Sequence, residues 1–144
     1  MAIRRKPRCF VAMAFAKDDT DAIYDQAIEP VLRRNGIIPV IINRQENNLD
    51  INIQIMHHLK SCDFCISDLT YARPSVYFEA GYAQRAVEVI YTVRGDHLKK
   101  GQPEDKRVHF DLQMKPLITW KDQSDSTFPT RLEQRIKQTF LKKA

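Results

Sequence analysis

Glycine is scarce in this sequence, with four residues in a chain of 144. Loops that wrap around phosphate groups need closely spaced glycines, and neither a dinucleotide-binding nor a Walker-type pattern is present. Long apolar runs are also missing, since no stretch approaches the roughly 20 residues that cross a bilayer. The run "CFVAMAF" at residues 9–15 is too short for a signal sequence, and we interpret it as part of a first strand.

Cysteine is limited to three residues, an odd number that argues against a disulfide framework and for the reducing cytoplasm. Cys62 and Cys65 have the spacing of a metal or redox pair. We expect both within a strand, on opposite faces, where a buried and reduced role is favoured. His57 and His58 are adjacent on a predicted helix and cannot chelate one ion together. The sequence therefore predicts no metal site and no cofactor.

The composition is that of one domain covering residues 1–144, and a hydrophobic content of 43% is enough to bury a core. The net charge of +5 comes from two basic ends, residues 4–8 and 131–143. Such ends attract polyanions, so nucleic acid is a candidate partner. We favour solvated ends, because the basic residues of the last segment do not share one stripe and no aromatic residues interleave with them. No membrane partner is expected.

Apolar runs of strand length alternate with helical patterns along the chain. Strands are predicted over residues 8–13, 37–42, 63–67, 87–93 and 116–120, and helices over 18–34, 50–60, 75–86 and a last segment that contains Phe128, Leu132, Ile136 and Phe140. Residues 94–110 are polar and contain glycine and proline, as a loop or a lid would. Strict alternation predicts an α/β fold, with a parallel sheet covered by helices on both faces.

Local signals refine the helix ends. Pro30 lies inside the first predicted helix and is expected to bend it. Asn35 and Gly36 follow as a stop signal. In the last helix, Thr130 and Glu133 have the spacing of a capping box.

Ligands of parallel sheets bind beyond the carboxyl ends of the strands. Asp68 ends the third predicted strand, and Glu79 lies in the first turns of the next helix, so we expect both to face one crevice. Glu79 stands out because its neighbours are mainly apolar, and a buried carboxylate is costly unless it is paired or used. The alternative is that Glu79 caps a loop or pairs with Arg73.

Three segments, "FVAMAF" (10–15), "DFCISDLT" (63–70) and "RPSVYFEAGYA" (73–83), resemble nucleoside 2-deoxyribosyltransferase-like domains. These domains are related in shape to Toll/interleukin-receptor-type NAD-cleaving domains. The resemblance spans roughly residues 8–120. It implies a flavodoxin-like three-layer sandwich with a five-stranded parallel sheet, and it assigns the nucleophile of the family to Glu79.

The sequence departs from the family at two places. Ala14 stands where closer relatives often have proline, and the aspartate that the transferases place just before the glutamate is absent, with Asp50 a loose substitute. The resemblance thus implies catalytic roles for Glu79, Asp68 and Asp50. It implies substrate contacts at the strand ends and in the following helix, namely Ala14, Phe15, Thr70, Tyr71, Arg73, Ser75 and Gly81.

Some of these roles have a physical reason. Tyr71 and Arg73 would stack on a base or hold a phosphate, although a surface role is equally open. Gly81 and Ala83 would keep one helix face thin, so that a sugar can approach the backbone. Relatives close their sites with a neighbouring subunit, so a homodimer or a larger homo-oligomer is expected.

An N-glycosidic bond suits such a site, because a nearby carboxylate can stabilise its oxocarbenium-like transition state or form a sugar ester. We therefore expect an enzyme that cleaves or transfers at this bond, with a nucleoside or nucleotide as substrate. Two alternatives stay open. One is an NAD-cleaving effector that uses the same glutamate, and the other is a non-enzymatic sensor that binds a nucleotide.

Overall fold

The computed structural model describes residues 5–41, 56–99 and 102–141. Five strands form one sheet in the order β2-β1-β3-β4-β5, and all four pairings are parallel. The strands are β1 (Arg8–Ala12), β2 (Ile38–Val40), β3 (Phe64–Asp68), β4 (Glu88–Arg94) and β5 (Ile118–Trp120). This is the flavodoxin-like strand order. The predicted α/β fold is confirmed, and each predicted strand is present.

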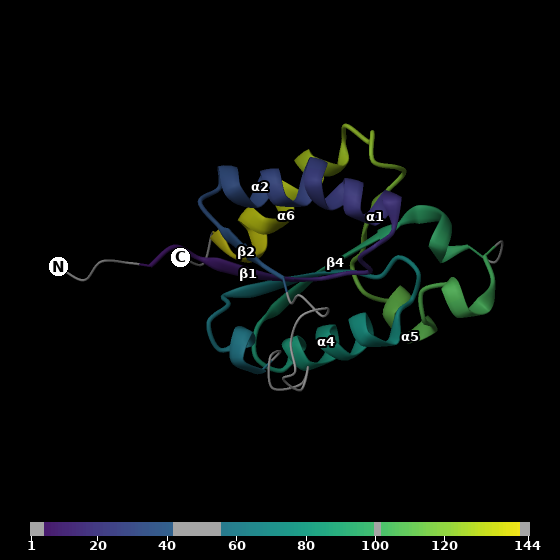
Figure 1. Cartoon of the computed structure of the whole chain (residues 1–144), viewed down its shortest axis with the longest axis horizontal. Coiled ribbons are helices and arrows are strands. Elements are labelled where there is room, and N and C mark those ends of the chain that lie inside the picture. The colour runs from purple at the N-terminus through teal and green to yellow at the C-terminus, as the bar shows by residue number, and fades with distance from the viewer. Residues whose placement is uncertain (1–4, 42–55, 100–101, 142–144) are drawn as a thin grey trace.

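Helices cover both faces of the sheet (Figure 1). One layer contains α1 (Asp18–Ile23), a π-helical turn (Tyr24–Ile28), α2 (Glu29–Arg34) and α6 (Phe128–Thr139). The other layer contains α4 (Pro74–Gln84), with the short helix α5 (Phe110–Gln113) on the same side. None of the helices in the described ranges has the length and apolarity needed to span a membrane.

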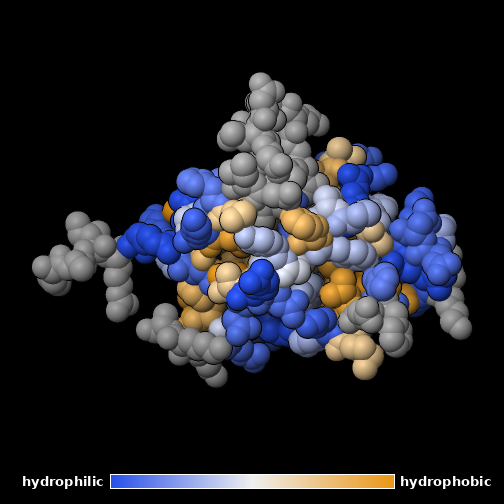
Figure 2. All heavy atoms as spheres, turned by 90° about the horizontal axis from the view of Figure 1, so that it is seen from below, coloured by the Kyte–Doolittle hydropathy of each residue, from blue (hydrophilic) through white to orange (hydrophobic). Residues whose placement is uncertain are grey.

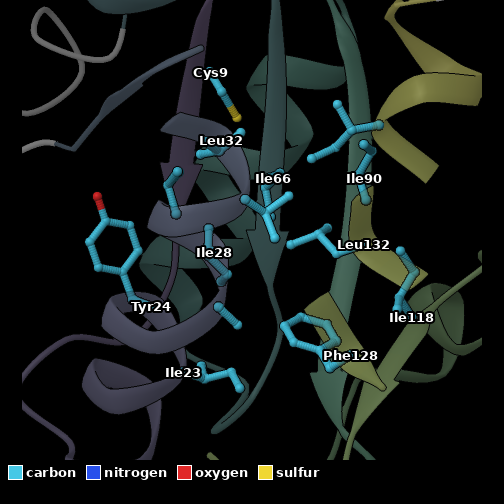
Figure 3. Close-up of a cluster of buried hydrophobic side chains, with 14 of the residues drawn as sticks. Cys9, Ile23, Tyr24, Ile28, Leu32, Ile66, Ile90, Ile118, Phe128 and Leu132 are labelled. Carbon is cyan, nitrogen blue, oxygen red and sulfur yellow. The ribbon is translucent and has the colours of Figure 1, made fainter. Parts of the chain in front are cut away.

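The alternation of side chains along β1 divides the core into two clusters. Cys9, Val11 and Met13 belong to the cluster beneath α1, α2 and α6, part of which Figure 3 shows. Phe10 and Ala12 belong to the cluster beneath α4. Successive residues of a strand point to opposite faces, so the continuous apolar run of β1 is what a strand covered on both sides requires.

The first helical segment is irregular at the position of Pro30, which lies in the first turn of α2, directly after the π-helical turn. Proline has no N–H for the carbonyl of Gln26, four residues earlier, and its ring crowds that carbonyl. A wider turn accommodates both effects. The predicted stop is confirmed, because Gly36 adopts φ 71°, the left-handed conformation that ends many helices.

The predicted capping box of the last helix is wrong. The capping position of α6 is Thr127, which makes no side-chain capping bond. Glu133 instead accepts hydrogen bonds from Arg34 and Asn35 at the end of α2. It therefore joins two helices of the same layer.

Three other predictions change in detail. Residues 94–110 are not a plain loop, because Arg94 still belongs to β4 and two 3-10 turns follow, Gly95–Leu98 and Glu104–Lys106. Cys62 and Cys65 are buried and free, as expected, but both belong to the cluster beneath α4, because β3 begins only at Phe64. Of the helix predicted over 50–60, residues 56–59 are helical, and 50–55 lie outside the described residues.

Candidate functional site

The strand order reverses between β1 and β3, which are neighbours while β2 and β4 lie on their outer sides. Ligands of such sheets bind at the carboxyl edge of this switch point. The loops that follow β1 and β3 hold every non-glycine residue with positive φ in the described chain, namely Ala16 (63°), Tyr71 (73°) and Ala72 (49°). Such conformations cost free energy and are concentrated at functional sites. The carboxyl edge is therefore the candidate site.

The turn from β3 into α4 follows from its sequence. Tyr71 and Ala72 reverse the chain, and Arg73 is extended (ψ 129°), as a residue before proline prefers. Pro74 then occupies the first turn of α4, where its missing N–H costs nothing. This turn fixes where α4 begins and which of its residues face the sheet.

Glu79 lies on the face of α4 that packs against the sheet. Its exposed fraction is 2%, and its neighbours Val76, Ala80 and Ala83 are buried as well. It lies five residues after Pro74, which is roughly 8 Å along the helix axis. Glu79 takes part in a polar interaction and is not an unpaired buried charge. Glu79 is therefore a carboxylate within a packed helix face, as its apolar neighbours in the sequence predicted.

Asp68, at the end of β3, is completely buried. Its carboxylate accepts hydrogen bonds from the Thr70 amide (3.1 Å), the Thr92 hydroxyl (2.6 Å) and the Trp120 indole N–H (2.8 Å). Burial raises the pKa of Asp68 above its ordinary value, and these hydrogen bonds oppose the rise. The side chain thus connects β3 to β4 and β5.

The expectation that Asp68 and Glu79 face one crevice has to be corrected. Side chains alternate along β3, so Asp68 points to the same face as Ile66, which belongs to the cluster beneath α1, α2 and α6. Its partner Trp120 belongs to the same cluster. Glu79 lies on α4, which covers the opposite face (Figure 1). The structure therefore gives the two carboxylates different surroundings.

A polar cluster at the carboxyl edge was not predicted. The Tyr71 hydroxyl donates to Asp19 (2.7 Å), and Arg94 donates to Asp19 and to Asp96 (2.7 Å to Oδ1). Burial, and then the hydrogen bond to Asp19, raise the pKa of Tyr71. The segment "RGDH" (94–97), which follows the fourth predicted strand, was the signal that could have indicated this cluster.

His97 completes this cluster and is buried, with an exposed fraction of 1%. Its Nε2 lies 3.0 Å from the Arg94 guanidinium, and its Nδ1 lies 3.0 Å from the Lys106 carbonyl. The Tyr71 amide N–H also points to Nδ1, at 3.2 Å. These contacts hold the His97 ring between Arg94, the turn at Tyr71 and the Lys106 carbonyl.

Several predicted substrate contacts lie in the core. Ala14 and Thr70 are buried, and the Thr70 hydroxyl accepts from the Arg94 amide at 2.9 Å. Phe15 packs against the core cluster, with its ring edge-on to Tyr24 at 6.3 Å. These three residues shape the loops, and their side chains offer little surface to a ligand.

The remaining predicted residues differ in position. Arg73 is half-buried and makes no side-chain hydrogen bond or ion pair within the described chain, so a pairing with Glu79 is not observed. Ser75 is half-buried and has a polar or electrostatic partner. The predicted position of Gly81 on a helix face that meets the substrate has to be corrected. Gly81 is exposed on the outer side of α4, with open space around it. Asp50 lies outside the described residues.

Within the described ranges, no group of three or more His, Cys, Asp or Glu side chains is placed to hold a metal ion. No model of a known protein family and no curated protein matches the chain. The functional argument therefore depends on the geometry of the carboxyl edge and on the motif at residues 73–83.

Proposed function

We propose that this protein cleaves or transfers at the N-glycosidic bond of a nucleoside or nucleotide, with Glu79 as the nucleophile. One observation carries the proposal. Glu79 is 2% exposed on the sheet-facing side of α4, and that helix starts from the strained turn at the switch point of the sheet. The resemblance of residues 73–83 to nucleoside 2-deoxyribosyltransferase-like domains supports the same assignment.

The chemistry needs one carboxylate and one proton. A Glu79 oxygen attacks the anomeric carbon, the bond from that carbon to the base nitrogen breaks with its electron pair going to the base, and the base takes up a proton. A water molecule or a second base then attacks the same carbon and releases the Glu79 carboxylate. Because Glu79 is nearly buried, the substrate approaches it from the carboxyl edge between β1 and β3.

In this proposal, the other polar residues at the carboxyl edge have supporting roles. Asp68 is saturated with hydrogen bonds on the opposite face, so it supports the end of β3 and does not touch the substrate. Arg73, beside the helix start, makes no side-chain ion pair with the residues that the structure describes, and it offers charge-assisted contacts to a phosphate or a base.

The test is a chromatographic assay of the protein with a panel of nucleosides, nucleotides and NAD. A transferase exchanges bases between two deoxynucleosides, an NAD-cleaving enzyme releases nicotinamide, and a sensor binds without turnover.

Glu79→Gln keeps the shape of the side chain and is expected to lower turnover by at least ~10²-fold. The matched control is Glu104→Gln, which changes an exposed glutamate in a 3-10 turn. Equal turnover in the wild type and Glu79→Gln, at matched melting temperatures, contradicts the catalytic role.

We propose further that the chain self-associates through the outer side of the α4 layer. Phe78 on α4 is 49% exposed and Met114, just after α5, is 80% exposed. The Tyr77 hydroxyl accepts a hydrogen bond from the His109 amide at 2.9 Å, which places the two segments next to each other. Figure 2 shows this side of the molecule, with apolar patches separated by hydrophilic residues.

A further inference from the structure

A cleft of about 730 Å³ lies at the amino edge of the sheet, opposite to the candidate site. It lies where α4 and α6 end and β4 begins, and its lining includes Gln84, Arg85, Val89, Lys115 and Phe140. Its volume is in the range of small-molecule sites, roughly 300–1,000 Å³. The proposed nucleophile Glu79 is not part of the lining. The cleft is therefore a separate feature of the fold.

The walls of this cleft combine apolar and polar surface. Val87, Val89 and Phe140 are half-buried and pack against the two core clusters. The Phe140 ring stacks on Phe64 with centroids 4.9 Å apart, so it is held in place. The Tyr91 hydroxyl donates to the Gln84 carbonyl oxygen at 3.1 Å, which leaves the Gln84 amide group free to donate. An apolar body with a polar end fits such a lining.

The charges of the lining favour an anion. Arg85 and Lys115 make no side-chain hydrogen bond or ion pair within the described chain. Of the two acids, Asp63 already accepts both guanidinium nitrogens of Arg5 (3.2 Å each) and the Arg8 amide (2.8 Å). Glu88 also takes part in an interaction. Within the described chain, Arg85 and Lys115 are thus the charged lining residues whose side chains are open to a ligand.

We propose that this cleft is a binding site for a small organic anion with an aromatic or similarly flat apolar body. Arg85 and Lys115 contact the anionic group, and the apolar body lies against Val87, Val89 and Phe140. Charge-assisted hydrogen bonds to a carboxylate, sulfonate or phosphate supply the specificity. The assignment is independent of the reaction proposed for Glu79.

The probe for the test is 8-anilinonaphthalene-1-sulfonate, titrated into the full chain and followed by its fluorescence. The uncharged N-phenyl-1-naphthylamine measures the apolar contribution alone. Removal of both charges in Arg85→Gln/Lys115→Gln is expected to raise the Kd of the sulfonate about tenfold, because charge-assisted bonds are lost. The Kd of the uncharged probe is expected to change less than twofold, as a rough bound.

Two controls separate this site from general effects. Lys99→Gln/Lys121→Gln removes the same charge from exposed positions outside the cleft and should leave the Kd unchanged. Glu79→Gln should also bind the probe like the wild type, so a failure of the proposed reaction does not affect this result. Circular dichroism checks that each variant is folded.

Amide chemical shifts provide the second measurement. In the wild type, the sulfonate is expected to shift the amides of residues 84–89, 115 and 139–140 more than others. Equal weakening in both double variants, shifts centred on another surface, or no saturation up to about 1 mM probe each overturns the proposal.

Discussion

At the scale of single residues, the two buried carboxylates show how similar groups acquire different roles. Asp68 accepts three hydrogen bonds in the core and connects three strands. Glu79 is just as buried, but it lies on a helix that starts at the strained edge of the sheet. Burial alone therefore does not identify a functional acid. The surroundings of each side chain decide its role.

Asp68→Asn is expected to destabilise the fold by about 1 to 3 kcal/mol, because an amide nitrogen would face donors that now meet a carboxylate oxygen. Urea unfolding at neutral pH measures this loss. Asp105→Asn, at an exposed position without a side-chain partner in the described chain, is the matched control and should lie within about 0.5 kcal/mol of the wild type. Equal unfolding free energies for the wild type and Asp68→Asn would show that the three bonds contribute little.

The same residue predicts a pH dependence. Its folded pKa is raised above the ordinary value of 3.8, so the folded state binds the proton more tightly than the unfolded chain does. The stability contributed by Asp68 is therefore greatest below that ordinary value and declines as the pH rises through the folded pKa. The stability difference between wild type and Asp68→Asn should shrink from the acidic to the neutral end of a urea series. A difference that grows with pH would contradict the raised pKa.

At the scale of elements, Gly36, which follows α2, and Gly81, which lies within α4, should respond in opposite directions to the same change. Gly36→Ala is expected to destabilise by roughly 1 kcal/mol, because alanine is strained at φ 71° although no atom would clash. Gly81→Ala should stabilise α4 by roughly 0.5 to 1 kcal/mol, since it lies inside a helix with open space around it. Thermal unfolding of both variants checks the signs.

Measuring the turnover of Gly81→Ala tests its predicted role in a second way. Its exposed position implies that Gly81→Ala keeps full turnover with any substrate found for the wild type. Loss of turnover without loss of stability would restore the contact role that the sequence resemblance assigns to Gly81.

The strands were the most predictable elements. Continuous apolar runs such as "CFVAM" and "FCIS" have one interpretation once helical patterns separate them, and β1 and β3 follow it. The end of α2 was equally clear, because Asn35 and Gly36 are local signals. The capping box failed because Glu133 has a stronger partner in Arg34, which is distant in the sequence. The spacing of Thr130 and Glu133 within one helix cannot indicate a partner on another helix.

The site was predictable only in part. Glu79 could be singled out, because a carboxylate among apolar neighbours is a local oddity. Its separation from Asp68 could not, because the face of a residue at a strand end depends on register, and a shift of one position reverses it. The cluster of Asp19, Arg94 and His97 combines the start of α1 with the end of β4 and the 3-10 turn after it, and only the sheet order brings these distant segments together.

At the scale of the whole molecule, three of the basic residues at the two ends form ion pairs within the chain. Arg5 pairs with Asp63, Arg131 with Asp125 and Lys137 with Glu133. We expect only weak binding of labelled single- or double-stranded DNA in a fluorescence anisotropy titration, and its loss at about 150 mM salt. Sub-micromolar binding that survives this salt and disappears on neutralising residues 4–8 would contradict the expectation.

Self-association is the second property at this scale. Light scattering is expected to give a dimer or a larger closed assembly, and Phe78→Ser should shift it towards the monomer, because an apolar contact of the α4 layer is lost. Gln138→Ser changes an exposed residue of α6, in the opposite layer, and is the matched control. A wild type that is monomeric and fully active at working concentration would exclude this proposal.

The bond between Trp120 and Asp68 also has an optical consequence. Trp120 is the sole tryptophan of the chain, and it is 1% exposed with its indole N–H bound to a buried carboxylate. Excitation at the red edge of the absorption band therefore reports on one chromophore at the seam of β3, β4 and β5. A shift of its emission to longer wavelength signals that this seam has opened. The natural sequence thus contains its own single-site spectroscopic label for the carboxyl edge.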